Sequence, residues 1–278
     1  MTQAAPAPIA APTRAAVTRS PKANVPEAMP LNLTEGTIAG GDRIVVYGTG
    51  GIGKSTVAAW LPAPIFLDLE RSTKKLQVKR DIVSGWTELR SKIAGFAANP
   101  PSGVRSLVID SASVAEEFAK EHVVATRRTE KGKSVDSIEG FGFGKGWQFV
   151  YDEFVALLSD LDKVADLGFN VCLVAHDVSV VVPNPYGVDW LRWQPKLHSG
   201  DKRGEKDIAS LVKNWCEHLL FIGYDVQVDE DGKGVGAGTR HIYSQELPTH
   251  VAKSRTAQFM LPFTTQAPGD VWQSLGIV

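Results

Sequence analysis

Apolar and polar positions follow two periods along the chain that indicate strands and helices. Residues 43–47, 64–70, 106–111 and 170–176 are short apolar runs that end in polar residues, which is typical of strands buried on both faces. Helical spacing is clearest in residues 83–98, where Trp86, Leu89, Ile93 and Phe96 share one face; residues 56–61, 114–126 and 147–166 also predict helices. Strands that alternate with helices predict an α/β fold, with a mainly parallel sheet and helices on both faces.

The C-terminal half has a weaker pattern. Residues 178–207 are rich in proline, glycine, tryptophan and charge, and we expect irregular structure there. Residues 208–217 predict a helix, residues 219–228 a strand and residues 229–238 a polar turn. The final strands are expected at residues 240–243 and 251–259.

The N-terminal segment differs from the rest of the chain. Residues 1–32 are rich in alanine and proline and predict a disordered tail before one α/β domain at residues 33–278. The segment lacks the apolar core and cleavage site of a secretory signal, and no stretch is long and apolar enough to span a membrane. We therefore expect a cytoplasmic protein with no membrane partner.

Charge and cysteine content narrow the classes of partner. The formal net charge of −1 means that the surface as a whole does not attract polyanions, so nucleic-acid binding would depend on local basic loops. Cys172 and Cys216 lie in apolar stretches without metal-site spacing, and we expect buried free thiols in a reducing compartment.

A glycine-rich segment at residues 48–56 carries the most specific chemical signal. It matches G-x-x-x-x-G-K-[ST] at every position and lies between a predicted strand and a predicted helix. Glycines let the backbone curl so that its N–H groups point at phosphate oxygens, and the helix N-terminus adds partial positive charge. The alternative is a glycine-rich turn with a solvated lysine. The predicted phosphate-binding residues are Gly48, Thr49, Gly50, Gly51, Ile52, Gly53, Lys54, Ser55 and Thr56.

ATP and Mg²⁺ are the cofactors that this P-loop predicts. Lys54 would reach the β- and γ-phosphates, and the Ser55 hydroxyl would ligate Mg²⁺. Asp110, at the end of an apolar strand, is the predicted partner of Ser55 in holding the ion. Asp68 also ends a strand and competes for this role, and for either residue the alternative is an aspartate that caps the next helix.

Two further strand-end residues are candidates for a part in hydrolysis. Glu70 would orient and deprotonate a water in line with the γ-phosphate; the alternative is a surface glutamate that pairs with Arg71 or Lys74. His176 ends its strand beside a long loop, where it would hydrogen-bond the γ-phosphate and report hydrolysis to that loop. A structural histidine satisfied by backbone groups is the alternative.

The order of these motifs resembles the RecA-like ATPase core. From the P-loop through residues 66–70 and 107–111 to the strand that ends in His176, the chain is most similar to phage-encoded ATP-binding proteins of that superfamily, including single-strand annealing proteins; the resemblance covers residues 33–263. It implies that Glu70 is the catalytic base and His176 the γ-phosphate sensor, although RecA has glutamine at the sensor position. It also implies that residues 127–146 and 178–207 contact single-stranded DNA.

Residues 252–255 are similar to the Lys-x-Arg element that RadA-type relatives insert into a neighbouring subunit's ATP site. The resemblance implies that Lys253 and Arg255 neutralise transition-state charge there, an effect of about 10³–10⁵ in rate for arginine fingers. Thr256 and Ala257 replace the aromatic–glycine pair of the longer RadA motif, and the alternative is a solvated basic strand edge.

Aromatic and basic residues are interleaved in both candidate DNA-binding loops, as in grooves for single strands. In the first loop Phe141, Phe143 and Trp147 are placed to stack on bases. The alternative is that the aromatic residues pin each loop to the domain. The first loop also has Arg127, Arg128, Lys131, Lys133 and Lys145, and the second has Trp190, Arg192, Trp193, Lys196, Lys202, Arg203 and Lys206.

The leading hypothesis is a phage-type RecA-like ATPase that acts on single-stranded DNA in recombination or annealing inside a bacterial host. It would be a homo-oligomer, a ring or a filament, whose ATP site is completed by a neighbouring subunit; a single-strand-binding protein is a further candidate partner. The alternatives are a small-molecule kinase, in which Arg127 and Arg128 belong to a lid over the phosphates, and a non-catalytic assembly scaffold that binds ATP. A helicase is compatible only as a ring, because one P-loop domain cannot form a tandem motor.

Overall fold

The structure is a computed structural model that describes residues 30–36, 38–200, 206–228, 234–255 and 259–278. The chain divides into two compact units, Met1–Ile38 and Ala39–Val278. The described residues of the first unit are exposed and contain neither helix nor strand. Most of the tail expected at residues 1–32 lies outside the described residues, so its predicted disorder and the predicted domain boundary stay predictions.

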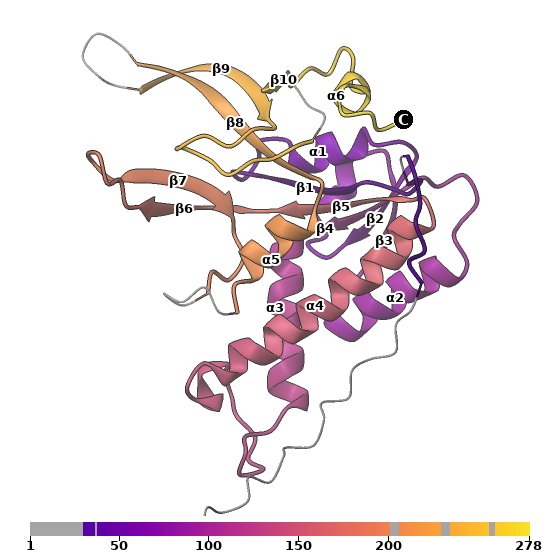
Figure 1. Cartoon of the computed structure of the whole chain (residues 1–278), viewed down its shortest axis with the longest axis vertical. Helices are drawn as coiled ribbons and strands as arrows, with labels where there is room; N and C mark the ends of the chain where they lie inside the picture. Colours follow the sequence, from indigo (N-terminus) through magenta and orange to yellow (C-terminus); the bar gives the residue numbers. More distant parts are fainter. Residues whose placement is uncertain (1–29, 37, 201–205, 229–233, 256–258) are drawn as a thin grey trace, which may run out of the picture. The chain divides into compact units, whose positions relative to one another are not determined.

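An eight-stranded sheet forms the centre of the second unit (Figure 1). Its strands are β1 (Arg43–Gly48), β2 (Pro64–Asp68), β3 (Lys79–Ile82), β4 (Ser106–Asp110), β5 (Asn170–Ala175), β8 (His218–Val228), β9 (Gly234–Tyr243) and β10 (Met260–Pro262). The order is β10-β9-β8-β1-β5-β4-β2-β3. Neighbouring strands are parallel from β8 to β3, whereas β9 pairs antiparallel with β8, and β10 pairs antiparallel with β9. The P-loop strand β1 is therefore separated from the Asp110 strand β4 by β5.

Helices cover both faces of this sheet, which confirms the fold class expected from the sequence (Figure 1). One face carries α2 (Trp86–Ala98), α3 (Ala112–Thr126), α4 (Lys145–Asp166) and α5 (Ile208–Trp215), and the other carries α1 (Lys54–Ala59) and α6 (Asp270–Ser274). Successive side chains of a strand point to opposite faces. In β1, Val45 and Tyr47 accordingly pack in the first layer, and Ile44 and Val46 in the second.

The helix α2 follows the periodicity expected from the sequence. Trp86, Leu89, Ile93 and Phe96 are all buried. They lie in the same apolar cluster as α3 and α4, so the predicted face is the one that meets the core.

Three segments differ from the expectation. Residues 178–207 are not irregular throughout, because β6 (Asp177–Val182) and β7 (Trp190–Pro195) form a separate antiparallel pair. The strand expected at residues 251–259 is wrong in its described part: Lys253 makes only an isolated bridge to Leu219, and the regular strand follows as β10. The edge strand β3 has mostly polar residues, so the apolar pattern did not indicate it.

Cys172 and Cys216 are buried free thiols, as expected. Burial raises the pKa of both, so neither is a reactive thiolate near neutral pH. Within the described residues, no helix has the length and hydropathy that crossing a membrane would require.

Candidate functional site

The P-loop leaves β1 at the carboxyl edge of the sheet and enters α1. Gly51 and Gly53 have φ values of +76° and +109°, which a residue with a side chain rarely adopts. Their N–H groups have no hydrogen-bond partner among the described residues. Since no acceptor in the described part of the protein competes for them, these amides are available for an acceptor such as a phosphate oxygen.

Lys54 is held inside this loop. Its side chain is largely buried, and Nζ donates a hydrogen bond to the Thr49 carbonyl oxygen at 3.0 Å. Burial lowers the pKa of Lys54, while the negative charges of Asp177, Asp110 and Glu70 act in the opposite direction. Lys54 is therefore not the solvated lysine of an ordinary glycine-rich turn.

Asp110, and not Asp68, lies against the P-loop serine. The Ser55 hydroxyl donates to Asp110 Oδ2 at 2.7 Å. Burial raises the pKa of Asp110 to about 6, and the hydrogen bond from Ser55 opposes this rise. Asp68 instead accepts hydrogen bonds from the backbone N–H groups of Ser72 and Thr73, at 3.2 Å each, and so caps the turn that follows β2.

The oxygens of Ser55 and Asp110 fit a Mg²⁺ ion that shares its coordination with a nucleotide. A hydroxyl and a carboxylate are hard donors of the kind that Mg²⁺ prefers. Among the described residues, no group of three or more His, Cys, Asp or Glu side chains could hold a metal ion. The described part of the chain thus offers no all-protein cage, and Mg²⁺ typically completes its shell with phosphates and waters.

Glu70 and His176 meet beside this pair. Since β2, β4 and β5 are parallel neighbours in register, the residues that follow them come together at one edge. The Ser111 hydroxyl donates to Glu70 Oε1, and His176 Nε2 lies 2.8 Å from the same oxygen. The side chains of Glu70 and His176 are 21% and 38% exposed, so a ligand can reach both. Among the described residues, neither Arg71 nor Lys74 pairs with Glu70.

Lys253 and Arg255 do not join the site within one chain. The backbone of Lys253 pairs with Leu219 at the start of β8, whereas the P-loop leaves β1 beside a later part of that strand. Lys253 Nζ lies 3.4 Å from the Asn214 carbonyl oxygen. Arg255 is exposed.

The aromatic residues of the first candidate DNA-binding loop have different environments. Phe143 is fully exposed. The Phe141 ring lies 5.3 Å from the Phe149 ring, edge to face, and Trp147 stacks on His198 with ring centroids 3.6 Å apart. The expectation that all three aromatic residues are free to stack on bases is therefore wrong for Phe141, which packs against α4, and for Trp147, which lies in α4 and stacks on His198 of the second candidate loop.

The basic residues of that loop also divide into two groups. Arg127 pairs with Glu153 at 3.1 Å, and Lys145 pairs with Glu130. Other cations remain exposed around a hollow of about 600 Å³. This hollow is lined by Arg128, Thr129, Glu130, Lys131, Lys133, Phe141, Phe143, Lys145, Gln148 and Phe149.

The second loop consists largely of the hairpin β6–β7. Arg192 pairs with Glu246 at 3.0 Å, and Lys202 and Arg203 lie outside the described residues. The hairpin exposes apolar side chains on both of its faces. These side chains are Val181, Tyr186, Val188, Trp190 and Leu191.

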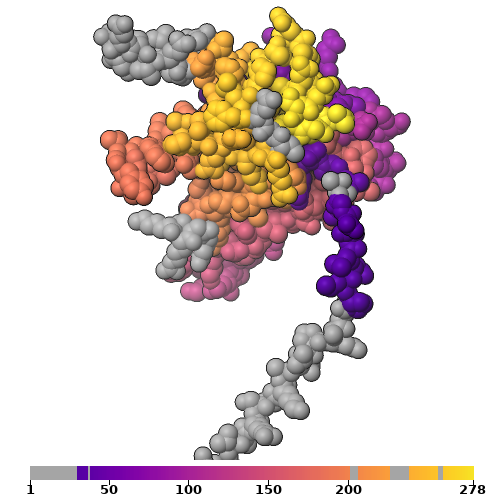
Figure 2. Space-filling model, turned by 45° about the horizontal axis from the view of Figure 1, so that its top comes forward, coloured from indigo at the N-terminus to yellow at the C-terminus, as the bar shows by residue number. Residues whose placement is uncertain are grey.

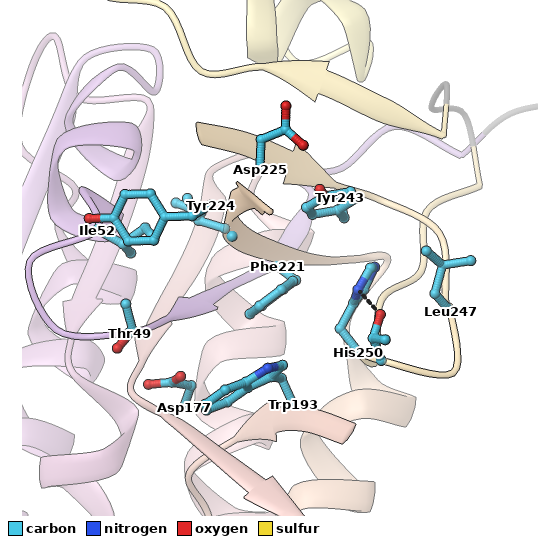
Figure 3. A pocket seen from close by; sticks show the side chains of 13 residues that line it. Thr49, Ile52, Asp177, Trp193, Phe221, Tyr224, Asp225, Tyr243, Leu247 and His250 are labelled. Carbon is cyan, nitrogen blue, oxygen red and sulfur yellow. Dashed lines mark hydrogen bonds between the residues drawn. The ribbon is translucent and has the colours of Figure 1, made fainter. Parts of the chain in front are cut away.

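A cavity of about 510 Å³ adjoins the P-loop (Figure 3). Thr49 lies on one side, with Asp177 and Trp193 below it and Phe221 in the centre. Asp177 directly follows His176, and its charge is the largest one that favours the protonated form of Lys54. Sequence reasoning missed Asp177, because nothing besides its neighbour in the chain marks it.

Sequence reasoning also missed Arg240 and Phe263. Arg240 Nη1 donates to the carbonyl oxygen of Ile52 in the P-loop at 2.8 Å, and its guanidinium lies over the Phe263 ring. Arg240 was expected only as part of a strand. Because 188 positions separate Arg240 from Ile52, no local pattern could have indicated their contact.

Comparison with known proteins identifies the family. A family model described as an AAA domain matches residues 41–256, and no curated protein matches the chain. Among solved structures, the RadB recombinase is 14% identical with a TM-score of 0.43, over 82% of this chain and 90% of that one. A KaiC-like protein from the hyperthermophilic archaeon Pyrococcus horikoshii is 13% identical with a TM-score of 0.43, over 83% and 88%. Since the family model spans most of the chain, including the P-loop, Asp110 and His176, the protein belongs to the AAA domain family of P-loop ATPases.

Proposed function

We propose that this protein binds Mg²⁺-ATP at its P-loop, hydrolyses it, and acts on single-stranded DNA in recombination or annealing. One observation carries the proposal: the pair of Ser55 and Asp110 and the pair of Glu70 and His176 converge beside P-loop amides that have no partner among the described residues. A triphosphate, its metal ion and an attacking water need those three kinds of group in one place.

Binding uses groups that are already oriented. Lys54 exchanges the Thr49 carbonyl for phosphate oxygens, and the P-loop N–H groups donate to further phosphate oxygens. Ser55 and Asp110 would hold the Mg²⁺ ion that accompanies the nucleotide. A bound Mg²⁺ supplies charge neutralisation at the phosphate oxygens.

Glu70 is the proposed general base. Its Oε1 is occupied by Ser111 and His176, while Oε2 accepts no hydrogen bond among the described residues. Two contacts on one oxygen fix the carboxylate plane, and the other oxygen is left to orient a water and take its proton as the γ-phosphate is attacked. His176 then connects this carboxylate to β6, which begins at the next residue.

The first loop and the hairpin support the DNA-binding part of the proposal. Phe143 offers an exposed ring for a base, and Lys131 and Lys133 lie beside it for phosphates. Tyr186 and Trp190 are exposed on the hairpin. Lys253 and Arg255 lie apart from the site of their own chain, which is the arrangement needed if they complete a neighbour's site in a ring or filament.

ATP turnover with and without oligo-dT at low salt tests the proposal. We expect turnover to be stimulated by the oligonucleotide, and Glu70→Gln to lower it by about 100-fold or more with ATP binding retained. Glu121→Gln, at an exposed glutamate of α3, is the matched control and should match the wild type. Unchanged turnover in Glu70→Gln would reject Glu70 as the base and favour an assembly scaffold. An absence of DNA binding and of stimulation would remove the role in recombination.

A further inference from the structure

We infer that Arg240 and Phe263 are positioning residues of the nucleotide site, and that Arg240 aims the Gly53 amide at the phosphates. This inference rests on the proposed function, because it concerns the same P-loop. The central contact is the hydrogen bond of 2.8 Å from Arg240 Nη1 to the Ile52 carbonyl oxygen. It joins the side chain of a residue in β9 to the backbone of the phosphate-binding loop.

The geometry of the peptide unit explains how this hydrogen bond orients the Gly53 N–H. The peptide between Ile52 and Gly53 is trans, so its C=O and its N–H point in opposite directions. With the Ile52 carbonyl fixed toward Arg240, the Gly53 N–H points away from Arg240. That N–H has no partner among the described residues, so no protein acceptor there competes with a ligand for it.

Phe263 fixes the same peptide from the side. The Arg240 guanidinium lies 4.0 Å from the centroid of the Phe263 ring, which restricts the position of the arginine. A Cβ at Gly53 would lie 2.6 Å from that ring and 3.1 Å from Arg240 Nη1. The Trp60 ring of the segment after α1 lies 5.3 Å from Phe263. The ring and the guanidinium therefore occupy the space beside Gly53 and limit alternative positions of the loop.

Both residues come from the antiparallel strands at the end of the chain. Arg240 lies in β9, and Phe263 directly follows β10. Figure 2 shows the C-terminal segment, coloured yellow, as one continuous surface with the orange strands β8 and β9. Phe263 lies beyond residues 41–256, which match the family model. The nucleotide site of this chain thus includes a support outside that matched region.

The test is equilibrium binding of a non-hydrolysable Mg²⁺-ATP analogue and of Mg²⁺-ADP. P-loop amides contact the α- and β-phosphates, so Arg240→Gln should weaken both nucleotides alike, by about tenfold, the factor for one hydrogen bond to a charged group. Arg240→Lys keeps a charged donor but loses the planar group that lies over the Phe263 ring, and it should restore affinity to within about threefold of the wild type. Phe263→Leu keeps apolar bulk but removes the stacked ring and should give a smaller loss, of about threefold.

Controls separate a positioning role from a loss of folding. Arg105→Gln, at an exposed arginine before β4, removes the same charge at the opposite edge of the sheet and should bind like the wild type. All variants should melt near the wild-type temperature. Recovery of nucleotide affinity in Arg240→Lys supports the inference, because affinity would then depend on a hydrogen-bond donor at position 240. A loss of packing alone would not be repaired by that donor. Wild-type affinity in both Arg240→Gln and Phe263→Leu overturns it. If Arg240→Gln does not fold, Phe263→Leu decides: a loss of about threefold supports the inference, and wild-type affinity overturns it.

The outcomes also separate this inference from the proposed function. Nucleotide binding by the wild type without hydrolysis or DNA stimulation would refute the proposed function and leave the role of Arg240 standing. Binding that is equal in the wild type and the Arg240 variants would refute the inference alone. No binding by the wild type would overturn both.

Discussion

The P-loop and the loop at residues 127–146 both combine glycines with lysines, yet they hold these lysines in different ways. Lys54 is buried with Nζ 3.0 Å from the Thr49 carbonyl oxygen, whereas Lys131 and Lys133 are exposed. A side chain that is already ordered loses little further entropy when a ligand binds, whereas an exposed lysine must be ordered by its ligand. The first arrangement suits one localised triphosphate, and the second suits an extended polyanion whose phosphates contact several cations in turn.

The largest expected effect separates the two loops directly. Lys54→Ala removes a charged donor from a buried site and should weaken ATP binding by about 100-fold or more. Lys131→Ala, in the exposed loop, is the matched control and should leave ATP affinity within about twofold, since it removes a solvated charge. The dissociation constants of ATP for both variants can be measured by calorimetric titration. Similar losses in the two variants would mean that the two loops do not differ in this way.

A second prediction concerns Glu116, a buried carboxyl group that contacts the segment after β7. Glu116 of α3 is buried and accepts a hydrogen bond of 2.6 Å from the His198 backbone N–H. Burial raises the pKa of Glu116 to about 7. Between the ordinary pKa and this value the folded state keeps a proton that the unfolded state releases, so the free energy of unfolding should fall as pH rises from about 4.5 to 7.

Glu116→Gln tests this dependence, because glutamine keeps the acceptor for His198 and cannot ionise. Relative to the wild type, the variant should gain about 1–2 kcal/mol of stability between pH 5 and pH 8. Urea unfolding at both pH values measures the difference, with Glu121→Gln as the exposed control. If the difference in the free energy of unfolding between the variant and the wild type does not change with pH, burial of the ionised Glu116 carboxylate does not destabilise the fold.

The smallest effect is expected at the exposed cations. Lys131→Ala combined with Lys133→Ala should weaken oligo-dT binding by about fivefold and lower the salt slope by about 1.4, or about 0.7 for each phosphate that is no longer neutralised. Phe143→Ala should weaken binding without changing that slope, because stacking releases no counterions. Fluorescence anisotropy at several salt concentrations distinguishes the two effects. An unchanged slope in the double variant would place the DNA elsewhere.

The parts of the fold that the sequence predicted are those whose signal is local. The apolar runs of β1, β4 and β5 are buried on both faces, so composition alone marks them, and α2 shows its buried face at helical spacing. The hairpin β6–β7 was missed because it is covered only in part: β6 alternates half-buried and exposed residues, and prolines and glycines between the strands obscure the pattern. Likewise, residues 251–255 have an apolar start, but Lys253 makes only an isolated bridge to Leu219 of β8 and not a continuous ladder.

The candidate site likewise contains residues that a local sequence signal predicted and residues that only the fold brings together. Gly48 to Thr56 could be found from the sequence because the loop and its helix are contiguous. The sequence favoured Asp110 over Asp68, but both end apolar strands, and it is the fold that places Asp110 beside Ser55. Arg240 and Phe263 depend on the order of β8, β9 and β10 in the sheet, which no short motif encodes.

The most direct test of the central claim is calorimetric titration of wild type and Ser55→Ala with a non-hydrolysable ATP analogue, with Mg²⁺ and with EDTA. We expect Mg²⁺ to strengthen binding to the wild type by about tenfold or more, and Ser55→Ala to lose most of this gain while it still binds the metal-free nucleotide. Equal affinity of the wild type with Mg²⁺ and with EDTA, or no binding in either, would contradict the claim that this loop holds a metal-bound triphosphate.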